Sequence, residues 1–271
     1  MGSRQTPGMS NAKLTKDERR EAAREKARRL REAEEKRQKR NKMLTIGAIL
    51  AAILIVALIV VKVITGGEKE KEYDGSARPA TLANVTDDFG IYFDASGKAG
   101  QKVDGVPVVG VFADLMCSAC VTFDKSNGAD MVPIMQDGKA TIIHYPVSTQ
   151  GTDFSTLGAA AEFYVATYAP DQWLKFKEGL YERSTEIFAG DRQQPNPNQI
   201  AMIAEEVGVP ADVVKDLPAS IKADDWTKVV TDATQKFREK GFRLTPTVVI
   251  DGKENVNWGG VGGLKKVVDA L

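Results

Sequence analysis

The sequence has few of the residues that bind metals or form disulfide frameworks. Its 271 residues include one histidine and two cysteines. A four-ligand Cys/His zinc site and a network of several disulfides are therefore both excluded within one chain. Aromatic residues make up 7% of the chain, and 37 basic side chains balance 37 acidic ones, so the formal net charge is zero.

The zero net charge hides an uneven distribution. Residues 1–42 hold 15 basic and 7 acidic side chains, whereas residues 43–271 hold 22 and 30. A cytosolic globular protein has no need of this division, but a chain that crosses a membrane does. Because the C-terminal part is acidic, it lacks the positive surface that binds phosphate backbones, and we expect no nucleic-acid partner.

One uncharged run lies between the two parts, at residues 43–61: MLTIGAILAAILIVALIVV. As a helix it would be about 28 Å long, close to the ~30 Å hydrocarbon layer of a bilayer. Basic residues before the run favour a cytoplasmic N-terminus. We therefore expect an uncleaved transmembrane helix over residues 43–64. A cleaved signal peptide is the alternative, but the leader is long and no small-x-small cleavage site follows it.

The sequence predicts four segments. Residues 1–42 form a basic cytoplasmic segment, either a solvated charged helix or a disordered tail, with attraction to anionic lipid headgroups as the alternative. Residues 65–79 read as a flexible linker, because they are charged and contain glycine. Residues 80–271 form one domain with an ample core, and a helical insertion interrupts it at about residues 152–241.

The domain reads as an α/β fold with a sheet and several amphipathic helices. β-Branched and aromatic residues predict the strands, and apolar residues at helical spacing predict the helices of the insertion. We expect Trp173, Phe176 and Leu180 to belong to the core, and the lone His144 to be held by hydrogen bonds in a strand. The expected strands are Phe89–Phe93, Val106–Phe112, Thr141–Pro146 and Thr247–Ile250, and a closing helix is expected over Gly263–Leu271.

Both cysteines stand in one C-x-x-C motif, Cys117-Ser118-Ala119-Cys120, directly after a predicted strand. If a helix starts at Cys117, the two sulfurs share one helical face. Backbone N–H groups at the helix start then stabilise a Cys117 thiolate, and Cys120 is shielded and reacts second. Redox catalysis by thiol-disulfide exchange is the interpretation we favour. A structural disulfide and half of a shared metal site stay open as alternatives.

A second motif, Thr245-Pro246-Thr247, enters the last predicted strand. Proline is tolerated there because a first strand position needs no N–H donor. A cis Thr245–Pro246 bond would expose the Thr245 backbone to an extended peptide, whereas an ordinary trans proline that starts a strand is the alternative.

These two motifs, with a helical insertion between them, resemble the thioredoxin superfamily, and within it the DsbA-like thiol-disulfide oxidoreductases of the membrane-anchored Gram-positive type. The similarity covers about residues 80–271. It implies that Cys117 is the nucleophile, that Cys120 is the resolving thiol, and that a cis Pro246 lies beside them with Thr245.

Three positions depart from the DsbA pattern. The dipeptide Ser118-Ala119 replaces Pro-His, so one contribution to thiolate stability is missing and we expect weaker oxidising power. Val111 occupies the position, six residues before Cys117, where many relatives carry a buried acid. Asp114 is close in sequence, but a side chain there can simply face solvent, so we assign it no role. The third position, Thr245, does not separate oxidases from isomerases.

The resemblance therefore implies a membrane-anchored thiol-disulfide oxidoreductase outside the cytoplasm, most simply one that forms disulfides in exported proteins. The alternatives are a reductase or isomerase, and a non-catalytic module that binds a metal or a partner. We expect no dissolved cofactor and no metal. The expected partners are exported substrates with cysteines and a membrane redox partner that recycles the dithiol.

Overall fold

A computed structural model describes residues 71–255 and 257–271. The predicted cytoplasmic segment and transmembrane helix, residues 1–64, lie outside the described residues. Among the described helices, none combines the length and the apolar composition that a membrane span requires.

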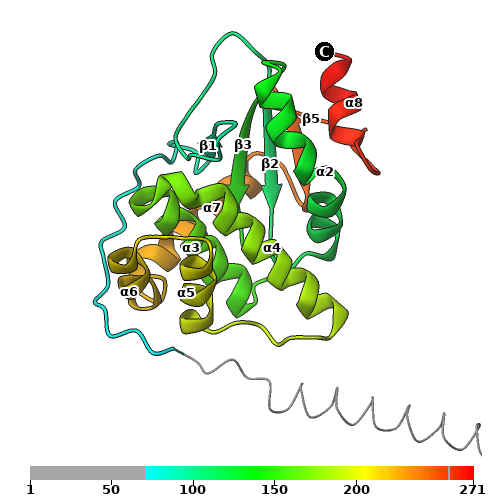
Figure 1. The fold of residues 1–271 in the computed structure, drawn as a ribbon. Coiled ribbons are helices and arrows are strands. Elements are labelled where there is room, and N and C mark those ends of the chain that lie inside the picture. Colours follow the sequence, from blue (N-terminus) through cyan, green and yellow to red (C-terminus); the bar gives the residue numbers. More distant parts are fainter. Residues whose placement is uncertain (1–70, 256) are drawn as a thin grey trace, which may run out of the picture. The chain divides into compact units, whose positions relative to one another are not determined.

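A five-stranded sheet lies at the centre of the described part (Figure 1). Its strand order is β1-β3-β2-β4-β5, with β2 and β3 parallel and the other neighbouring strands antiparallel. The strands are β1 (Ile91–Phe93), β2 (Val108–Ala113), β3 (Thr141–Pro146), β4 (Thr247–Ile250) and β5 (Lys253–Glu254). The four longer strands agree with the predicted ones, and β5 was not predicted.

The helices divide into two groups. The helix that follows β2 is α2 (Ser118–Gln136), and it packs beside the C-terminal α8 (Gly263–Asp269). The other helices stand between β3 and β4 in the chain, and Figure 1 shows them gathered beyond one end of the sheet. They are α3 (Asp153–Tyr168), the short η1 (Pro170–Gln172), α4 (Trp173–Ala189), α5 (Pro197–Glu206), α6 (Ala211–Ser220) and α7 (Asp224–Glu239).

Successive side chains of β2 point to opposite faces of the sheet, and both faces are buried. Val109 and Val111 join the main core with the first turns of α2, whereas Phe112 points to the other face. There it stacks on Tyr145 with ring centroids 4.0 Å apart and contacts Phe237 from the end of α7. The strand that leads to the cysteines is therefore fixed from both sides.

The helical insertion has its own apolar interior, continuous with the main core. Trp173, Phe176 and Leu180 on α4 are fully buried, which confirms their prediction as core residues. Trp226 on α7 is also fully buried, and its indole N–H donates to the Arg78 carbonyl at 2.7 Å.

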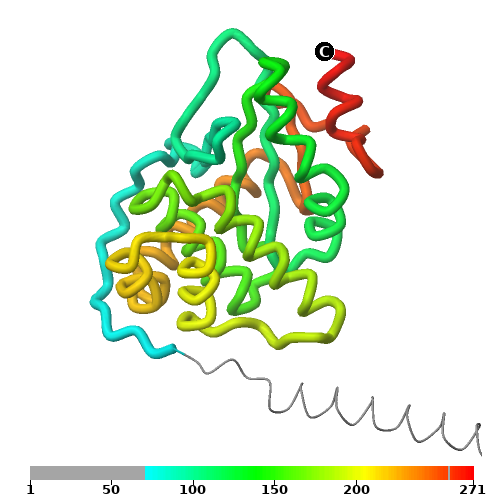
Figure 2. The backbone as a smooth tube through the Cα atoms, in the orientation of Figure 1, coloured from blue at the N-terminus to red at the C-terminus, as the bar shows by residue number. Residues whose placement is uncertain are grey.

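The segment before the sheet is held along the insertion. Figure 2 shows its cyan tube beside the yellow and orange helices. Arg78 is the main attachment: its guanidinium pairs with Asp216 at 2.7 Å and with Asp212 at 3.1 Å. Tyr73 donates to Glu205 at 3.0 Å. The described part of the expected linker, residues 71–79, is thus bound to α5 and α6 and does not hang free.

Candidate active site

The two cysteines lie where β2 ends and α2 begins. Cys117 is the N-cap residue of α2, with φ −97° and ψ 113°, and the helix itself begins at Ser118. The Cys117 N–H donates to the Asp114 carbonyl at 3.1 Å, which closes the turn between strand and helix. Both sulfurs are free thiols. The N-terminal end of α2 therefore presents its unpaired N–H groups at the sulfur of Cys117.

Cys117 is the more acidic thiol. Hydrogen bonding from the Cys120 thiol is the main reason that the Cys117 pKa falls from 9.0 to about 6, and burial opposes the shift. The Thr245 side chain and the backbone N–H groups of Cys120 and Ala119 lower this pKa further. At neutral pH, Cys117 is consequently a thiolate, the form that attacks disulfides.

Cys120 has the opposite character. Its side chain is fully buried. Burial, together with the neighbouring Cys117, raises the pKa of the Cys120 thiol far above its ordinary value. The Asp114 N–H points at the Cys120 sulfur, 3.5 Å away. Cys117 is therefore the reactive sulfur and keeps 8% of its surface exposed, whereas Cys120 is protonated and fully covered.

The structure brings Thr245 and Pro246 to the cysteines. When protonated, the Cys117 thiol donates to the Thr245 carbonyl, with 3.1 Å between sulfur and oxygen, and the Thr245–Pro246 peptide bond is cis. Leu244, the preceding residue, is 80% exposed. All four residues that the sequence singled out thus belong to one site, with an exposed apolar side chain beside it.

Asp114, to which the sequence assigned no role, is buried beside the cysteine turn. Its side chain is 1% exposed. The carboxylate accepts hydrogen bonds from Met116 N at 2.8 Å and from Ser155 Oγ at 2.7 Å. It also accepts from Thr149 N at 2.6 Å and from Gln150 N at 2.8 Å. The fifth donor is Thr149 Oγ1, at 3.1 Å. These five donors replace water, which explains how the carboxylate can be buried.

Sequence reasoning missed this loop altogether. Thr149, Gln150 and Ser155 lie some 30 to 40 positions after the cysteine motif in the chain, and nothing in their spacing links them to it. The one usable signal was the run of Ser and Thr residues at 148–156, which is typical of a loop that caps a helix. Thr152 does cap α3, by accepting from Ser155 N at 3.2 Å.

A second buried polar pair lies deeper in the core. His144 on β3 is 3% exposed, and its Nε2 is 3.0 Å from Glu162 Oε2 on α3, an ion-pair distance without the alignment of a hydrogen bond. His144 is the β3 partner of Val111, the position where the acid of many relatives is missing. The prediction that His144 lies in a strand is confirmed, but its Nε2 makes no hydrogen bond with the described residues.

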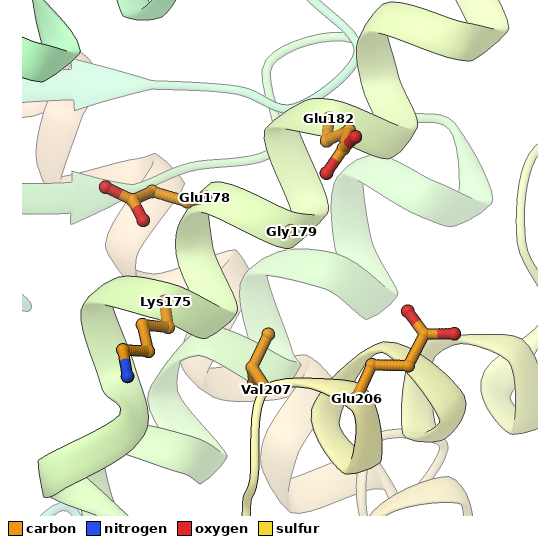
Figure 3. Close-up of a pocket in the computed structure, with 6 residues that line it drawn as sticks. All are labelled: Lys175, Glu178, Gly179, Glu182, Glu206 and Val207. Atoms are coloured by element: carbon orange, nitrogen blue, oxygen red, sulfur yellow. The ribbon is translucent and has the colours of Figure 1, made fainter.

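Several surface hollows lie apart from the four site residues. Figure 3 shows one of about 400 Å³ on the insertion, which three glutamates line together with Lys175, Gly179 and Val207. Burial raises the pKa of one of them, Glu178. Another hollow, of about 310 Å³, lies on the Phe112 side of the sheet. Within the described residues, no three His, Cys, Asp or Glu side chains are grouped so that they could hold a metal ion.

The comparisons with known proteins agree with this geometry. A family model described as "Thioredoxin" matches residues 103–270, which is more than half of the chain and includes both motifs. The chain belongs to the thioredoxin family. The predicted thioredoxin-like α/β fold is therefore confirmed. No curated protein sequence matches the chain.

Several solved structures share the fold of this thioredoxin-family chain. One is the MdbA protein, a thiol-disulfide oxidoreductase from Actinomyces oris, with 20% identity, a TM-score of 0.63, and coverage of 73% of this chain and 97% of that chain. Another is BdbD from Bacillus subtilis, with 17% identity, a TM-score of 0.56, and coverage of 73% and 98%. DsbA from Mycobacterium tuberculosis is also similar, with 18% identity, a TM-score of 0.53, and coverage of 67% and 91%.

Proposed function

We propose that this protein is a thiol-disulfide oxidoreductase that acts outside the cytoplasm and forms disulfides in exported proteins. The observation that carries the proposal is the contrast between its two sulfurs. The pKa of Cys117, which is 8% exposed, is lowered to about 6, whereas burial raises the pKa of the fully covered Cys120. Thiol-disulfide exchange needs this pairing of an attacking or leaving thiolate with a protected second thiol.

The reaction begins from the oxidised pair. A client thiolate attacks the Cys117 sulfur, the Cys117–Cys120 bond breaks, and Cys120 leaves and takes up a proton. A second client thiolate then attacks the client sulfur of the mixed disulfide, and Cys117 leaves as a thiolate. Two electrons pass from the client to the pair, and the client gains one disulfide. A stable Cys117 thiolate favours this direction, because it is a good leaving group.

The client is held as an extended chain in our proposal. The Thr245–Pro246 segment borders Cys117 and is half-buried, and Leu244 projects beside it into solvent. In the proposal, the client adds beside this segment by main-chain hydrogen bonds. The exposed Leu244 side chain would contact an apolar client residue next to the reacting cysteine.

The location rests on the sequence. Residues 43–64 would anchor the chain, and residues 1–42 would stay in the cytoplasm by the positive-inside rule. Disulfides persist in the oxidising space outside the membrane. The proposed cycle also requires a membrane redox partner that withdraws two electrons from the reduced pair. Solved structures whose titles name thiol-disulfide oxidoreductases or DsbA proteins support the activity by their common fold.

Trapping the mixed disulfide tests the proposal. With a client that carries a 5-thio-2-nitrobenzoate mixed disulfide, reduced Cys120→Ser protein should form a stable adduct through Cys117, because no second thiol can resolve it. The wild-type protein should release the client instead, and Cys117→Ser should do neither. Mass spectrometry reads the adduct and its site. Absence of the Cys120→Ser adduct, or an adduct on a residue other than Cys117, would rule the proposed chemistry out.

A further inference from the structure

Asp114 connects the three segments that make up the active site. Its carboxylate accepts from Met116 N in the cysteine turn and from Thr149 in the loop after β3. Thr149 Oγ1 in turn lies 3.3 Å from Thr245 Oγ1, beside the cis proline. A chain of hydrogen-bonding groups therefore runs from Asp114 through Thr149 to Thr245.

The carboxylate fixes the direction of this chain. An ionised carboxyl group only accepts hydrogen bonds. Thr149 Oγ1 donates its single hydrogen to Asp114 Oδ2 at 3.1 Å. Since a hydroxyl has one hydrogen, Thr149 can only accept from Thr245. The Thr245 hydroxyl must therefore donate toward Thr149.

The Thr245 hydroxyl has a second possible acceptor. The Cys117 sulfur lies beside this residue, 3.1 Å from the Thr245 carbonyl oxygen, and hydrogen bonding from the Thr245 side chain contributes to the lowered Cys117 pKa. The hydroxyl cannot give its one hydrogen fully to both. A Thr245 hydroxyl that donates to Thr149 is therefore unavailable to the Cys117 thiolate.

We propose that Asp114 is a positioning residue, which acts through Thr149 to turn the Thr245 hydroxyl away from the Cys117 sulfur. The positioning of the Thr245 hydroxyl does not depend on the proposed function; only its effect on oxidising power rests on that function. By limiting the stability of the Cys117 thiolate, Asp114 makes the reduced form less stable and the oxidised pair a weaker oxidant.

A pair of substitutions at Thr149 tests the mechanism. Thr149→Val removes the hydroxyl but keeps the side-chain shape and the backbone N–H that binds Asp114. The Thr245 hydroxyl then keeps Cys117 as its partner, and the Cys117 pKa should fall by about half a unit to one unit. Thr149→Ser keeps the hydroxyl and should leave this pKa unchanged. The measurement is the rate of iodoacetamide alkylation of Cys117 against pH in the reduced protein.

Two controls separate positioning from simple loosening of the site. Ser155→Ala removes another donor to the same carboxylate, Ser155 Oγ, which donates to Asp114 Oδ1 and not to the oxygen that Thr149 Oγ1 contacts, so this variant should not lower the Cys117 pKa. In a Thr245→Val background, the effect of Thr149→Val should vanish. If Thr149→Val unfolds, Thr149→Ala makes the same test with a smaller side chain.

The outcomes are distinct. An unchanged or raised Cys117 pKa in Thr149→Val, an equal fall in Ser155→Ala, or a fall that persists without the Thr245 hydroxyl would overturn the proposal. These measurements need no client. A failure of the adduct test would therefore reject the oxidoreductase function and leave the Asp114 relay standing, whereas a failure here would leave the function standing.

Discussion

At the scale of single residues, the site depends on the contrast between two otherwise identical side chains three positions apart. Cys117 caps a helix and meets donors, whereas Cys120 lies one turn deeper among apolar groups. Without Pro-His between the cysteines, the Cys117 pKa of about 6 lies above the value of about 3.5 that is typical of DsbA itself. The weaker oxidising power expected from Ser118-Ala119 is in line with this difference.

The lowered Cys117 pKa predicts how the stability of the reduced protein depends on pH. The thiol titrates near pH 6 when folded and at its ordinary 9.0 when unfolded. A depressed folded pKa stabilises the protein above the unfolded value, and this stability is lost as the pH falls through the folded value. The free energy of unfolding should therefore rise by about 1.4 kcal/mol per pH unit between about pH 6 and pH 8.

Urea unfolding under reducing conditions measures this slope. Cys117→Ser is the reference, because it lacks the titrating thiol and shares all other groups with the wild-type protein. The difference between the two proteins should grow with pH. Cys120 does not obscure the effect, since a raised folded pKa acts only above the ordinary thiol value. Parallel curves for the two proteins would contradict the lowered pKa.

The sequence located the four residues that the structure brings together, but not the groups that support them. A C-x-x-C motif after a strand is a local pattern, and a Thr-Pro entry to a strand is another. Asp114 is different, because its surroundings depend on a loop some 35 residues further along the chain. Whether such a carboxylate faces water or five donors is decided by tertiary packing, which no local pattern encodes.

At the scale of elements, the position of the cysteine turn depends on its close packing against α3. Leu115, which is 2% exposed, fills the space over Gly158 on α3. A Cβ at position 158 would overlap Leu115 Cδ1. The lack of a side chain on α3 thus allows the turn that carries Cys117 to approach the insertion.

Two glycine substitutions in helices test this contact. Gly158→Ala should destabilise the protein by about 1–3 kcal/mol, because it overpacks Leu115. Gly128→Ala, in α2, is the matched control: its Cβ would meet only the Asp124 side chain, at 3.3 Å. Alanine there should be neutral or stabilise by up to about 1 kcal/mol. Equal midpoints of chemical unfolding for the two variants would show that the close approach of Leu115 is unimportant.

Elements with a strong periodic pattern were predictable, and weakly patterned ones were not. Thr141–Pro146 and Thr247–Ile250 match β3 and β4 because runs of β-branched residues are buried on both faces. The exposed two-residue β5 carries no apolar signal, so it was missed. Residues 71–79 likewise carry no apolar pattern, so their sequence looks like that of a linker. Ion pairs such as Arg78–Asp216 hold them in place, and such pairs cannot be read from composition.

At the scale of the whole molecule, the proposal makes a prediction about topology. The full chain should stay in the membrane fraction after alkaline carbonate washing, because residues 43–64 would span the bilayer. Protease added to intact protoplasts should digest the domain and spare a tag on the N-terminus. A shortened, released domain would instead support the cleaved signal peptide, and a protected domain would contradict the proposed orientation.

The attachment of residues 71–79 to the insertion limits how far the enzyme can range. In the proposed topology, about seven residues separate the membrane helix from Lys71, and fully extended they reach at most about 25 Å. Because Arg78 and Tyr73 bind the insertion, residues 71–79 add no flexible length to this connection. In the proposed topology, so short a connection would keep the domain beside the membrane. It would then meet exported chains as they emerge, before they diffuse away.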